Sequence, residues 1–459
     1  MTELVESAEY EGLMDLIEDE PPPPNDDQRI KAAKEYPITV KVHINDQADC
    51  DKFADLLGCD LSSNQTEITF NKNAKRKAGA TYTENRADPF KRSTTHKTRI
   101  ESVLWGNTTD FRNDFIPPQQ SFDIVLTDAS QHIAFLRLLK QQLSFETTYT
   151  YFPKVEKTVS QGKFWVSKFE DHQPRHPIFI VSKGRAYSRV TAMALQRMGV
   201  PFRIIIEPQD WDDYEAFFDS SQLIVAPFSN HKNGPGRARN LAWDIAIKEG
   251  HSAHWVMDDN IKDFYRLHEN ARTRFADGGC FRVMEDFFDR CENLYIAGPQ
   301  YRFFCAPRSG YSPFVLNTRI YSCLLIRNDC KYRWRGRYNE DTDLSLRVLK
   351  DGDCTLQWNE FLQEKMATQA LSGGNTAEFY HAEYRTGDDD PELGTYHANG
   401  TWNKSIMLEK MHPDVAKAVW KFGRWHHEVD YNPFKANKLR FKAGMETSGR
   451  TYPFELITI

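Results

Sequence analysis

The stretch PIFIVS at residues 177–182 is a short apolar run between charged and polar segments, which predicts a buried strand. It is followed by a helical pattern, SRVTAMALQRMG at 188–199, and by a second apolar run, FRIIIE at 202–207. Two more such runs come later, SQLIVAPF at 221–228 and HWVMDDN at 254–260. Strands that alternate with helices at this spacing predict an α/β fold with a doubly wound, mostly parallel sheet.

Polar residues follow several of these predicted strands. In a doubly wound sheet, ligands bind in the crevice beyond the carboxyl ends of the strands. The topology therefore brings three loops to one rim, although they lie far apart in the sequence: residues 182–185, 228–239 and 258–260. We expect the functional site at this rim.

Asp258, Asp259 and Asn260 directly follow the apolar residues 255–257. Two adjacent aspartates are compatible with a helix cap, a surface turn or a metal site. Their position at the end of a strand on the ligand rim favours the metal site. Carboxylate and amide oxygens suit Mg²⁺ or Mn²⁺, which takes few protein ligands and leaves room for substrate phosphates.

The loop SNHKNGPGRARN at 229–240 places a tight turn before a predicted helix that Arg237 and Arg239 open. A helix N-terminus with guanidinium groups suits an anion such as a diphosphate. An ordinary glycine-rich loop with surface arginines is equally compatible with this pattern. The loop is not a Walker motif, because no GKS or GKT follows, and the chain has no GxGxxG.

An acidic group stands at the start of another predicted helix, in YRWRGRYNEDTDLSLRVLKDG at 332–352. Asn339, Glu340 and Asp341 fall in or next to its first turn, where carboxylates complement the helix dipole. One carboxylate that faces a cleft could instead act as a general base. The sequence leaves both roles open.

A basic and aromatic segment, WKFGRWHHEVDYNPF at 420–434, contains two adjacent histidines. His426 and His427 are either structural or ligands of a metal. Lys421 and Arg424 of the same segment are candidates for contacts with phosphate.

Composition limits the class of protein. No stretch approaches the roughly 20 apolar residues that a membrane helix needs, so we expect no membrane span. The first 28 residues carry ten acidic groups and no Lys or Arg, which is the wrong sign for a signal or transit peptide. Eight cysteines without any CxxC spacing favour reduced thiols in a cytoplasmic protein.

The net charge of −6 conceals a segregation of charge. Beyond the acidic first 28 residues the chain carries +4, and residues 72–99 hold nine Lys or Arg against two acidic residues. Such a block is either a solvated arm or a contact with a nucleic-acid backbone. The candidate DNA-contacting residues in it are Lys75, Arg76, Lys77, Lys91 and Arg92.

Residues 36–160 predict a separate, small α+β domain. ITVKVHI at 38–44 alternates like a strand and precedes a helical segment, and EITF at 67–70 is the predicted returning strand. The same succession recurs at 122–152, and two such halves favour a ferredoxin-like arrangement. The basic segment 72–99 interrupts them.

In chain order, PIFIVSKGRA, GPGRARN, WVMDDN and RGRYNEDTDLSLRVLKDG resemble the nucleotide-sugar site of glycosyltransferases of the GT-A fold. The longer segments NTRIYSCLLIRND, RWRGRYNEDTDLSLRVLKDG and KFGRWHHEVDY resemble the TET/JBP-associated glycosyltransferases, over about residues 160–440. That family occurs mainly in bacteriophages, which would place the protein in the cytoplasm of a bacterial host. The resemblance implies transfer from a nucleoside-diphosphate sugar, with UDP favoured, to a 5-hydroxymethylated pyrimidine in DNA, with 5-hydroxymethylcytosine favoured.

The resemblance also assigns roles to residues. Asp258 and Asn260 would match the metal positions of the DxD motif and hold Mn²⁺ or Mg²⁺. The neutral Asn at the third place departs from the motif and weakens cation binding, so the shell would rely on Asp259 or on His426 or His427.

Asp341 would match the general base, supported by Glu340, and a carboxylate opposite the leaving group implies inversion at the anomeric carbon. The nucleotide sugar would be contacted by polar residues at the strand ends and by the basic aromatic segment: Ser182, Lys183, Arg185, Arg237, Arg239, Asn240, Asp258, Lys421 and Arg424.

We therefore expect an acidic disordered tail at 1–35, the small domain at 36–160, a GT-A domain at 161–442 and a C-terminal tail at 443–459. Two other functions are compatible with the residues. One is a GT-A glycosyltransferase with a protein or small-molecule acceptor, whose activity would not respond to neutralising residues 72–99. The other is a non-catalytic DNA-binding protein on the same fold, which the carboxylates at the rim disfavour.

Overall fold

The computed structural model describes residues 38–44, 47–57, 67–70, 100–113, 120–139, 149–152, 162–230, 234–305, 310–366, 401–421, 424–447 and 449–458. These residues belong to two compact units. The small unit spans 21–97 and 116–158, and the large unit includes 98–115 and 159–459. The expected tail at 1–35 and the candidate DNA contacts Lys75, Arg76, Lys77, Lys91 and Arg92 lie outside the described residues.

The small unit contains a four-stranded sheet in the order β2-β3-β1-β4. Its central pair, β1 with β3, is antiparallel, and both outer pairs are parallel. Val40, Val42 and Ile44 alternate along β1 and are buried with Phe53 of α3 and Phe122 of β3. The elements are β1 Ile38–Ile44, α3 Gln47–Leu57, β2 Glu67–Thr69, β3 Gln120–Leu126, α5 Ala129–Leu138 and β4 Tyr149–Phe152.

The large unit is built on a twelve-stranded sheet in the order β18-β5-β11-β10-β15-β12-β14-β9-β6-β7-β8, with β13 beside β15. The four strands β9, β6, β7 and β8 pair in parallel, and β14 and β10 join neighbouring strands antiparallel. The strands are β5 Lys163–Ser167, β6 Ile178–Val181, β7 Arg203–Ile206, β8 Leu223–Val225, β9 Ala253–Asp258, β10 Ile261–His268, β11 Ala271–Phe275, β12 Leu294–Tyr301, β13 Phe314–Leu316, β14 Cys323–Arg327, β15 Cys354–Lys365 and β18 Phe454–Thr458.

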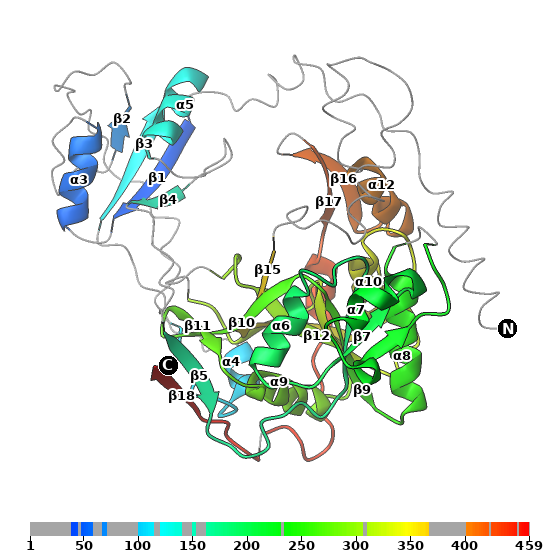
Figure 1. Cartoon of the computed structure of the whole chain (residues 1–459). Helices are drawn as coiled ribbons and strands as arrows, with labels where there is room; N and C mark the ends of the chain where they lie inside the picture. Colours follow the sequence, from blue (N-terminus) through cyan, green and yellow to red (C-terminus); the bar gives the residue numbers. More distant parts are fainter. Residues whose placement is uncertain are drawn as a thin grey trace, which may run out of the picture. The chain divides into compact units, whose positions relative to one another are not determined.

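Helices cover both faces of this sheet (Figure 1). Along β6, Ile178 and Ile180 are buried on the face covered by α6, α7 and α9, whereas Phe179 is buried on the face covered by α8 and α10. The doubly wound α/β class is thus confirmed. The helices are α6 Val190–Arg197, α7 Trp211–Glu215, α8 Gly236–Lys248, α9 Gly279–Arg290 and α10 Glu340–Lys350.

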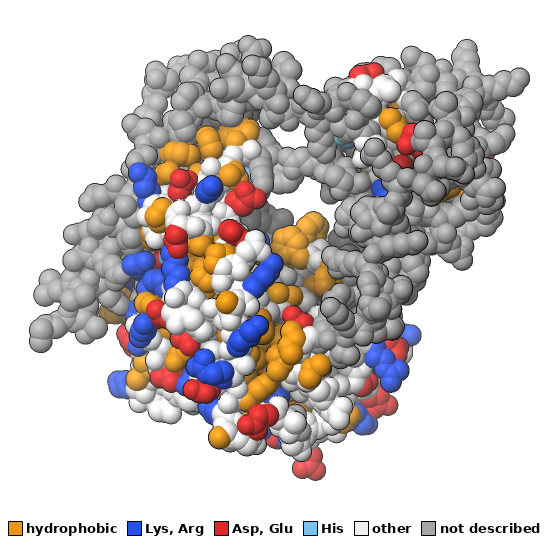
Figure 2. Space-filling view, turned by 180° about the vertical axis from the view of Figure 1, so that it is seen from behind, with side chains coloured by type: hydrophobic (Ala, Val, Ile, Leu, Met, Phe, Trp, Pro, Cys, Tyr) orange, Lys and Arg blue, Asp and Glu red, His pale blue; other side chains and the backbone are white. Residues whose placement is uncertain are grey.

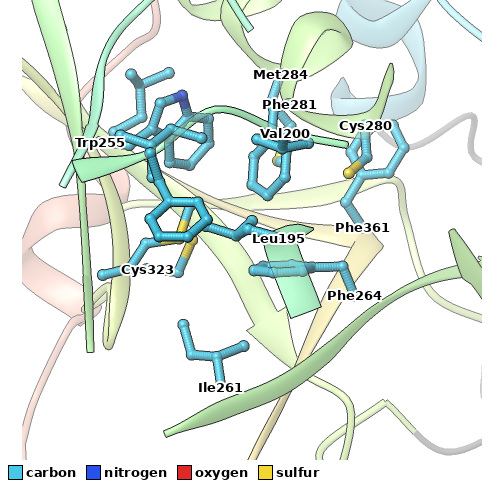
Figure 3. Close-up of a cluster of buried hydrophobic side chains, with 14 of the residues drawn as sticks. Leu195, Val200, Trp255, Ile261, Phe264, Cys280, Phe281, Met284, Cys323 and Phe361 are labelled. Carbon is cyan, nitrogen blue, oxygen red and sulfur yellow. The ribbon is translucent and has the colours of Figure 1, made fainter. Parts of the chain in front are cut away.

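The larger core cluster packs aromatic rings between α9 and the middle of the sheet (Figure 3). The ring of Phe281 lies 5.3 Å from that of Trp255 and 4.9 Å from that of Phe264, both in edge-to-face geometry. Leu195 and Met284 close the cluster from α6 and α9. Each such side chain contributes about 1.5–3 kcal/mol through burial, so this cluster fixes the strands that carry the rim.

The segment between the two parts of the small unit belongs to the large unit, which differs from the expected boundary at 36–160. It contains α4, Ile100–Trp105, whose Trp105 ring lies 5.1 Å from that of Phe287. Thr109 donates a hydrogen bond to Glu360 at 2.8 Å, and the buried Arg266 donates to the same carboxylate at 2.9 Å. The hydrogen bond from Thr109 to the buried Arg266–Glu360 ion pair therefore ties this segment to the sheet.

The C-terminal elements complete the large unit. Helix α12, Thr401–Met411, and the hairpin β16, Ala416–Lys421, with β17, Arg424–Val429, adjoin α10 through Leu346, Leu349 and Leu408. β18 lies within the expected tail at 443–459 and pairs with β5, so these residues form an edge of the main sheet. In the described part of the chain, no helix has the length and apolarity to cross a membrane.

On the described part of the face seen from behind, Lys and Arg are interspersed with Asp and Glu, and hydrophobic side chains lie between them (Figure 2). The seven described cysteines are buried and unpaired: Cys50, Cys280, Cys291, Cys305, Cys323, Cys330 and Cys354. Burial raises the pKa of the Cys291 thiol to about 12, so this thiol is protonated and unreactive at neutral pH.

Replacing Arg266 by Met should destabilise the large unit by about 3–5 kcal/mol, because it leaves the buried Glu360 carboxylate without its cation. The double variant Arg266→Met with Glu360→Leu should recover much of this loss. Lys168→Met is the matched control, since Lys168 pairs with Glu455 at 2.7 Å on the surface and should cost less than about 1 kcal/mol. Urea unfolding measures all three, and equal costs for both single variants would exclude a structural role of the buried pair.

Candidate active site

The carboxyl ends of the parallel strands open into one cavity of about 300 Å³. β6 ends before Ser182, β7 before Glu207 and β9 at Asp258, and all three residues line it. The end of β12, the loops before and after β14, and the start of α10 contribute further lining residues. The lining includes Ser182, Lys183, Arg185, Glu207, Arg239, Asp258, Asp259, Asn260, Tyr301, Tyr321, Ser322, Glu340, Asp341, Lys365 and Lys404.

Asp258 lies between two cations from different elements. Its Oδ1 accepts a hydrogen bond from Arg239 Nη2 at 2.7 Å, and its Oδ2 accepts one from Lys365 Nζ at 2.7 Å. Burial opposes ionisation, but Lys365 and Arg239 outweigh it and hold the pKa of Asp258 well below its usual range. This carboxylate is therefore charged at every physiological pH.

Arg239 of α8 links three of the carboxylates that line the cavity. Besides Asp258, it donates from Nη1 to Glu340 at 3.0 Å and to Asp341. Its guanidinium also lies 4.7 Å from the centre of the Trp334 ring, and only 4% of the side chain is exposed. A planar guanidinium can hold several carboxylates at once, which lysine could not do with the same fixed geometry.

Asp341, in the first turn of α10, has an unusual proton affinity. Its pKa is raised to about 7: burial is the largest cause, Glu340 and Asp258 add to it, and Arg239 and Lys365 oppose it. Its Oδ2 accepts a weak hydrogen bond from the backbone N–H of Ser322 at 3.4 Å. A carboxyl with a pKa near 7 can exchange a proton at neutral pH, which is the property of a general base.

Asp259 points to the other side of the rim. Its Oδ2 accepts a hydrogen bond from Ser182 Oγ at 2.6 Å, and its Oδ1 pairs with Arg185 at 2.5 Å. Ser182 Oγ also contacts Tyr214 OH at 2.5 Å. Asp259 therefore fixes the loop after β6 in place, and both of its oxygens are already used.

The loop before α8 packs closely against the loop before α10. Gly234 has φ +77°, and a Cβ at this position would lie 2.5 Å from the carbonyl oxygen of Arg337. The amide of Asn240 donates to Trp334 O and accepts from Trp334 N, both at 3.0 Å. These contacts hold the two loops together, so that Arg239 lies within hydrogen-bonding distance of Asp341.

Residues 176–374 match the family model described as TET-Associated Glycosyltransferase. This segment, which is less than half of the chain, is similar to the TET-associated glycosyltransferases. A comparison with solved structures gives, among its matches, a nucleotide-diphospho-sugar transferase from Desulfovibrio desulfuricans, with 14% identity and a TM-score of 0.24 over 40% of this chain and 80% of the other. A comparison with curated proteins gives no match. The coarse activity that the family match supports is glycosyl transfer.

Most of the expected site residues line one cavity. Ser182, Lys183, Arg185 and Arg239 line it, together with the expected acidic and metal residues at 258–260 and 340–341. Arg237 and Asn240 are not among the described lining residues, and the amide of Asn240 is engaged by Trp334.

The histidine pair lies on β17, beyond the residues that match the family model. Neither His426 nor His427 is among the described residues that line the cavity. Burial and then Arg319 lower the pKa of His427 to about 4, so it is neutral at pH 7. Lys421 and Arg424 stand opposite each other in the hairpin, and their side chains lie outside the described residues.

The residues of the cavity that were not expected from the sequence include Glu207, Tyr301, Tyr321, Ser322, Lys365 and Lys404. Ser322 has φ +64°, and its Oγ contacts Lys365 Nζ and Tyr301 OH, both at 2.7 Å. A left-handed conformation at a non-glycine residue costs energy and is common at functional sites. The one local feature that could have indicated a role for Lys365 is its position at the end of a strand.

Gly234→Ala should lower the affinity for the nucleotide sugar by about tenfold or more, because the new Cβ displaces the Arg337 loop and with it the Arg239 network. Gly250→Ala is the matched control: Gly250 has φ +81° just beyond the other end of α8, and nothing lies within 4 Å of its Cβ position. Both variants should lose a similar stability from backbone strain. Calorimetric titration with UDP-sugars separates them, and equal affinities in the two variants would contradict this account of the loop contact.

Proposed function

We propose that this chain transfers a sugar from a nucleoside-diphosphate sugar, with UDP favoured, to the hydroxyl of a 5-hydroxymethylated pyrimidine in DNA, with 5-hydroxymethylcytosine favoured. The observation that carries the proposal is a carboxyl of pKa about 7, Asp341, in the same cavity as the cations Arg239 and Lys365. The match to a TET-associated family and the basic segment 72–99 support a DNA acceptor.

The reaction needs a base on one side of the sugar and positive charge on the other. Asp341 takes the proton of the acceptor hydroxyl as its oxygen bonds to the anomeric carbon. The bond from this carbon to the diphosphate breaks at the same time, and the leaving oxygen carries the electron pair. Lys365, Lys183 and Arg239 lie in the cavity wall, where they can stabilise the diphosphate. Attack from the side opposite the leaving group inverts the anomeric centre.

The oxygens of Asp258 and Asn260 fit a divalent cation that binds together with the donor. Both residues line the cavity, and Asn260 Oδ1 is buried without a hydrogen-bond partner among the described residues. The described residues contain no group of three or more His, Cys, Asp or Glu arranged to hold a metal. Few protein ligands are typical of Mg²⁺ and Mn²⁺ sites, in which substrate phosphates complete the shell. Such an ion would supply additional charge for the departing diphosphate.

Asp341→Asn should reduce transfer by about 10²–10⁴-fold while nucleotide-sugar binding stays within about threefold. In the wild type, kcat/KM should fall about tenfold per pH unit below about 7, because only the ionised carboxylate accepts a proton. The charged groups that face Asp341 are Arg239, Glu340, Asp258 and Lys365. Mass spectrometry of DNA that contains 5-hydroxymethylcytosine, 5-hydroxymethyluracil or cytosine, incubated with a panel of nucleotide sugars, measures the transfer.

Asp351→Asn is the matched control for this experiment, since Asp351 caps the other end of α10 and pairs with Lys331 at the surface. It should retain wild-type transfer. A wild-type enzyme that binds nucleotide sugars but modifies no DNA would refute the proposed acceptor. Full transfer by Asp341→Asn would refute the proposed base.

Transfer should require Mn²⁺ or Mg²⁺ and stop in EDTA. Asn260→Ala should raise the Mn²⁺ concentration needed for half-maximal activity by about tenfold, and Asn260→Asp should lower it, because a carboxylate binds the cation more strongly than an amide. Calorimetry should show weak Mn²⁺ binding to the free protein and stronger binding with UDP present. Undiminished transfer in EDTA would show that Arg239 and Lys365 alone carry the charge compensation.

A further inference from the structure

Two phenylalanines stand exposed at the end of β12. Phe303 is 80% and Phe304 is 53% accessible to solvent. Large apolar side chains at such exposure are candidates for contact with a partner when they are contiguous with a binding site. Both belong to the large unit and directly follow Tyr301, which lines the cavity.

These side chains form a continuous aromatic row, defined here as Phe303, Phe304, Tyr301 and Tyr321. The ring of Phe304 lies 5.4 Å from that of Phe303 and 6.0 Å from that of Tyr301. Tyr301 in turn stacks on Tyr321, with ring centres 6.2 Å apart and planes 16° from parallel. The aromatic row thus leads from the solvent into the wall of the cavity.

The inner end of the aromatic row reaches the residues that carry the chemistry. Tyr301 OH contacts Ser322 Oγ at 2.7 Å, and the same Oγ contacts Lys365. Tyr321 OH contacts Thr342 Oγ1 at 3.2 Å, beside Asp341. The guanidinium of Arg319 lies 5.1 Å from the centre of the Tyr321 ring and adds a positive charge at this end.

The backbone of the aromatic row is held in place by buried residues between its members. Arg302 is buried and pairs with Glu364 at 2.8 Å, and Cys305 is also buried. The hydroxyl of Tyr311 donates to the carbonyl oxygen of Phe304 at 2.8 Å. The exposed rings are therefore presented from a fixed segment, which limits the entropy lost when a partner stacks on them.

We propose that the aromatic row is the acceptor platform: it stacks on an unpaired pyrimidine base and its neighbour, and so brings the hydroxymethyl group to Asp341. This inference rests on the proposed function and deepens it. Asp341 is 8% exposed and lines a cavity of about 300 Å³ that must also hold the sugar, which disfavours access by a base inside an intact duplex. Enzymes that act on a base take it out of the stack, and aromatic rings replace the lost stacking.

The test compares the double variant Phe303→Leu with Phe304→Leu, which keeps apolar volume but removes the flat rings, with Phe303→Trp, which keeps a ring. Phe217→Leu is the matched control, as Phe217 is another partly exposed phenylalanine of the large unit. The full chain acts on oligonucleotides that carry one 5-hydroxymethylcytosine, in a single strand, unpaired in a duplex, or fully paired. Steady-state kinetics give KM for the DNA, kcat and KM for the nucleotide sugar.

The double leucine variant should raise KM for DNA by about tenfold or more, with kcat within about threefold and KM for the nucleotide sugar unchanged. Phe303→Trp should stay within about threefold of wild type, and wild type should prefer the unpaired base to the paired one. A KM for DNA like that of Phe217→Leu would overturn the platform while leaving the proposed function intact. Absence of transfer to any DNA by the wild type, with the nucleotide sugar bound, would remove the proposed acceptor and this inference together.

Discussion

The cavity depends on one guanidinium, that of Arg239. It joins Asp258 at the end of β9 to Glu340 and Asp341 at the start of α10, three carboxylates from two segments that are far apart in the chain. Removing a single partner from such a buried group leaves an uncompensated charge and costs several kcal/mol. Gly234 packs closely against Arg337, and Asn240 forms a hydrogen bond with Trp334. Both contacts join the segment that carries Arg239 to the segment that precedes α10.

The same arrangement shifts the pKa values of two aspartates in opposite directions. Asp258 has two cations within hydrogen-bonding distance, Arg239 and Lys365, and its pKa is held low. Asp341 shares Arg239 with Glu340 and is buried, and its pKa rises to about 7. Environments that push the pKa values of neighbouring carboxyls apart assign different roles to chemically identical groups. Asp258 is suited to remain an anion beside a cation, and Asp341 is suited to exchange a proton.

Much of the fold was predictable because parallel strands buried on both faces form continuous apolar runs, as PIFIVS and FRIIIE do. The rim followed from the topology, and with it most of the cavity. Lys365 was not predictable, because β15 mixes apolar residues with buried polar ones such as Glu360. Asp259 lines the cavity as the pattern suggested, whereas Asn240 is not among the described lining residues. Their partners Ser182 and Trp334 come from distant segments, and local patterns do not report such contacts.

The neutral residue at position 260 fits the charge balance of the cavity. Five carboxylates line it, Glu207, Asp258, Asp259, Glu340 and Asp341, and so do five cations, Lys183, Arg185, Arg239, Lys365 and Lys404. Another carboxylate at 260 would hold a divalent cation more firmly. It would also add an uncompensated negative charge and raise the pKa of Asp341 above about 7, so that less of this carboxyl is ionised at neutral pH. Asparagine supplies an oxygen for the cation without raising the pKa of Asp341.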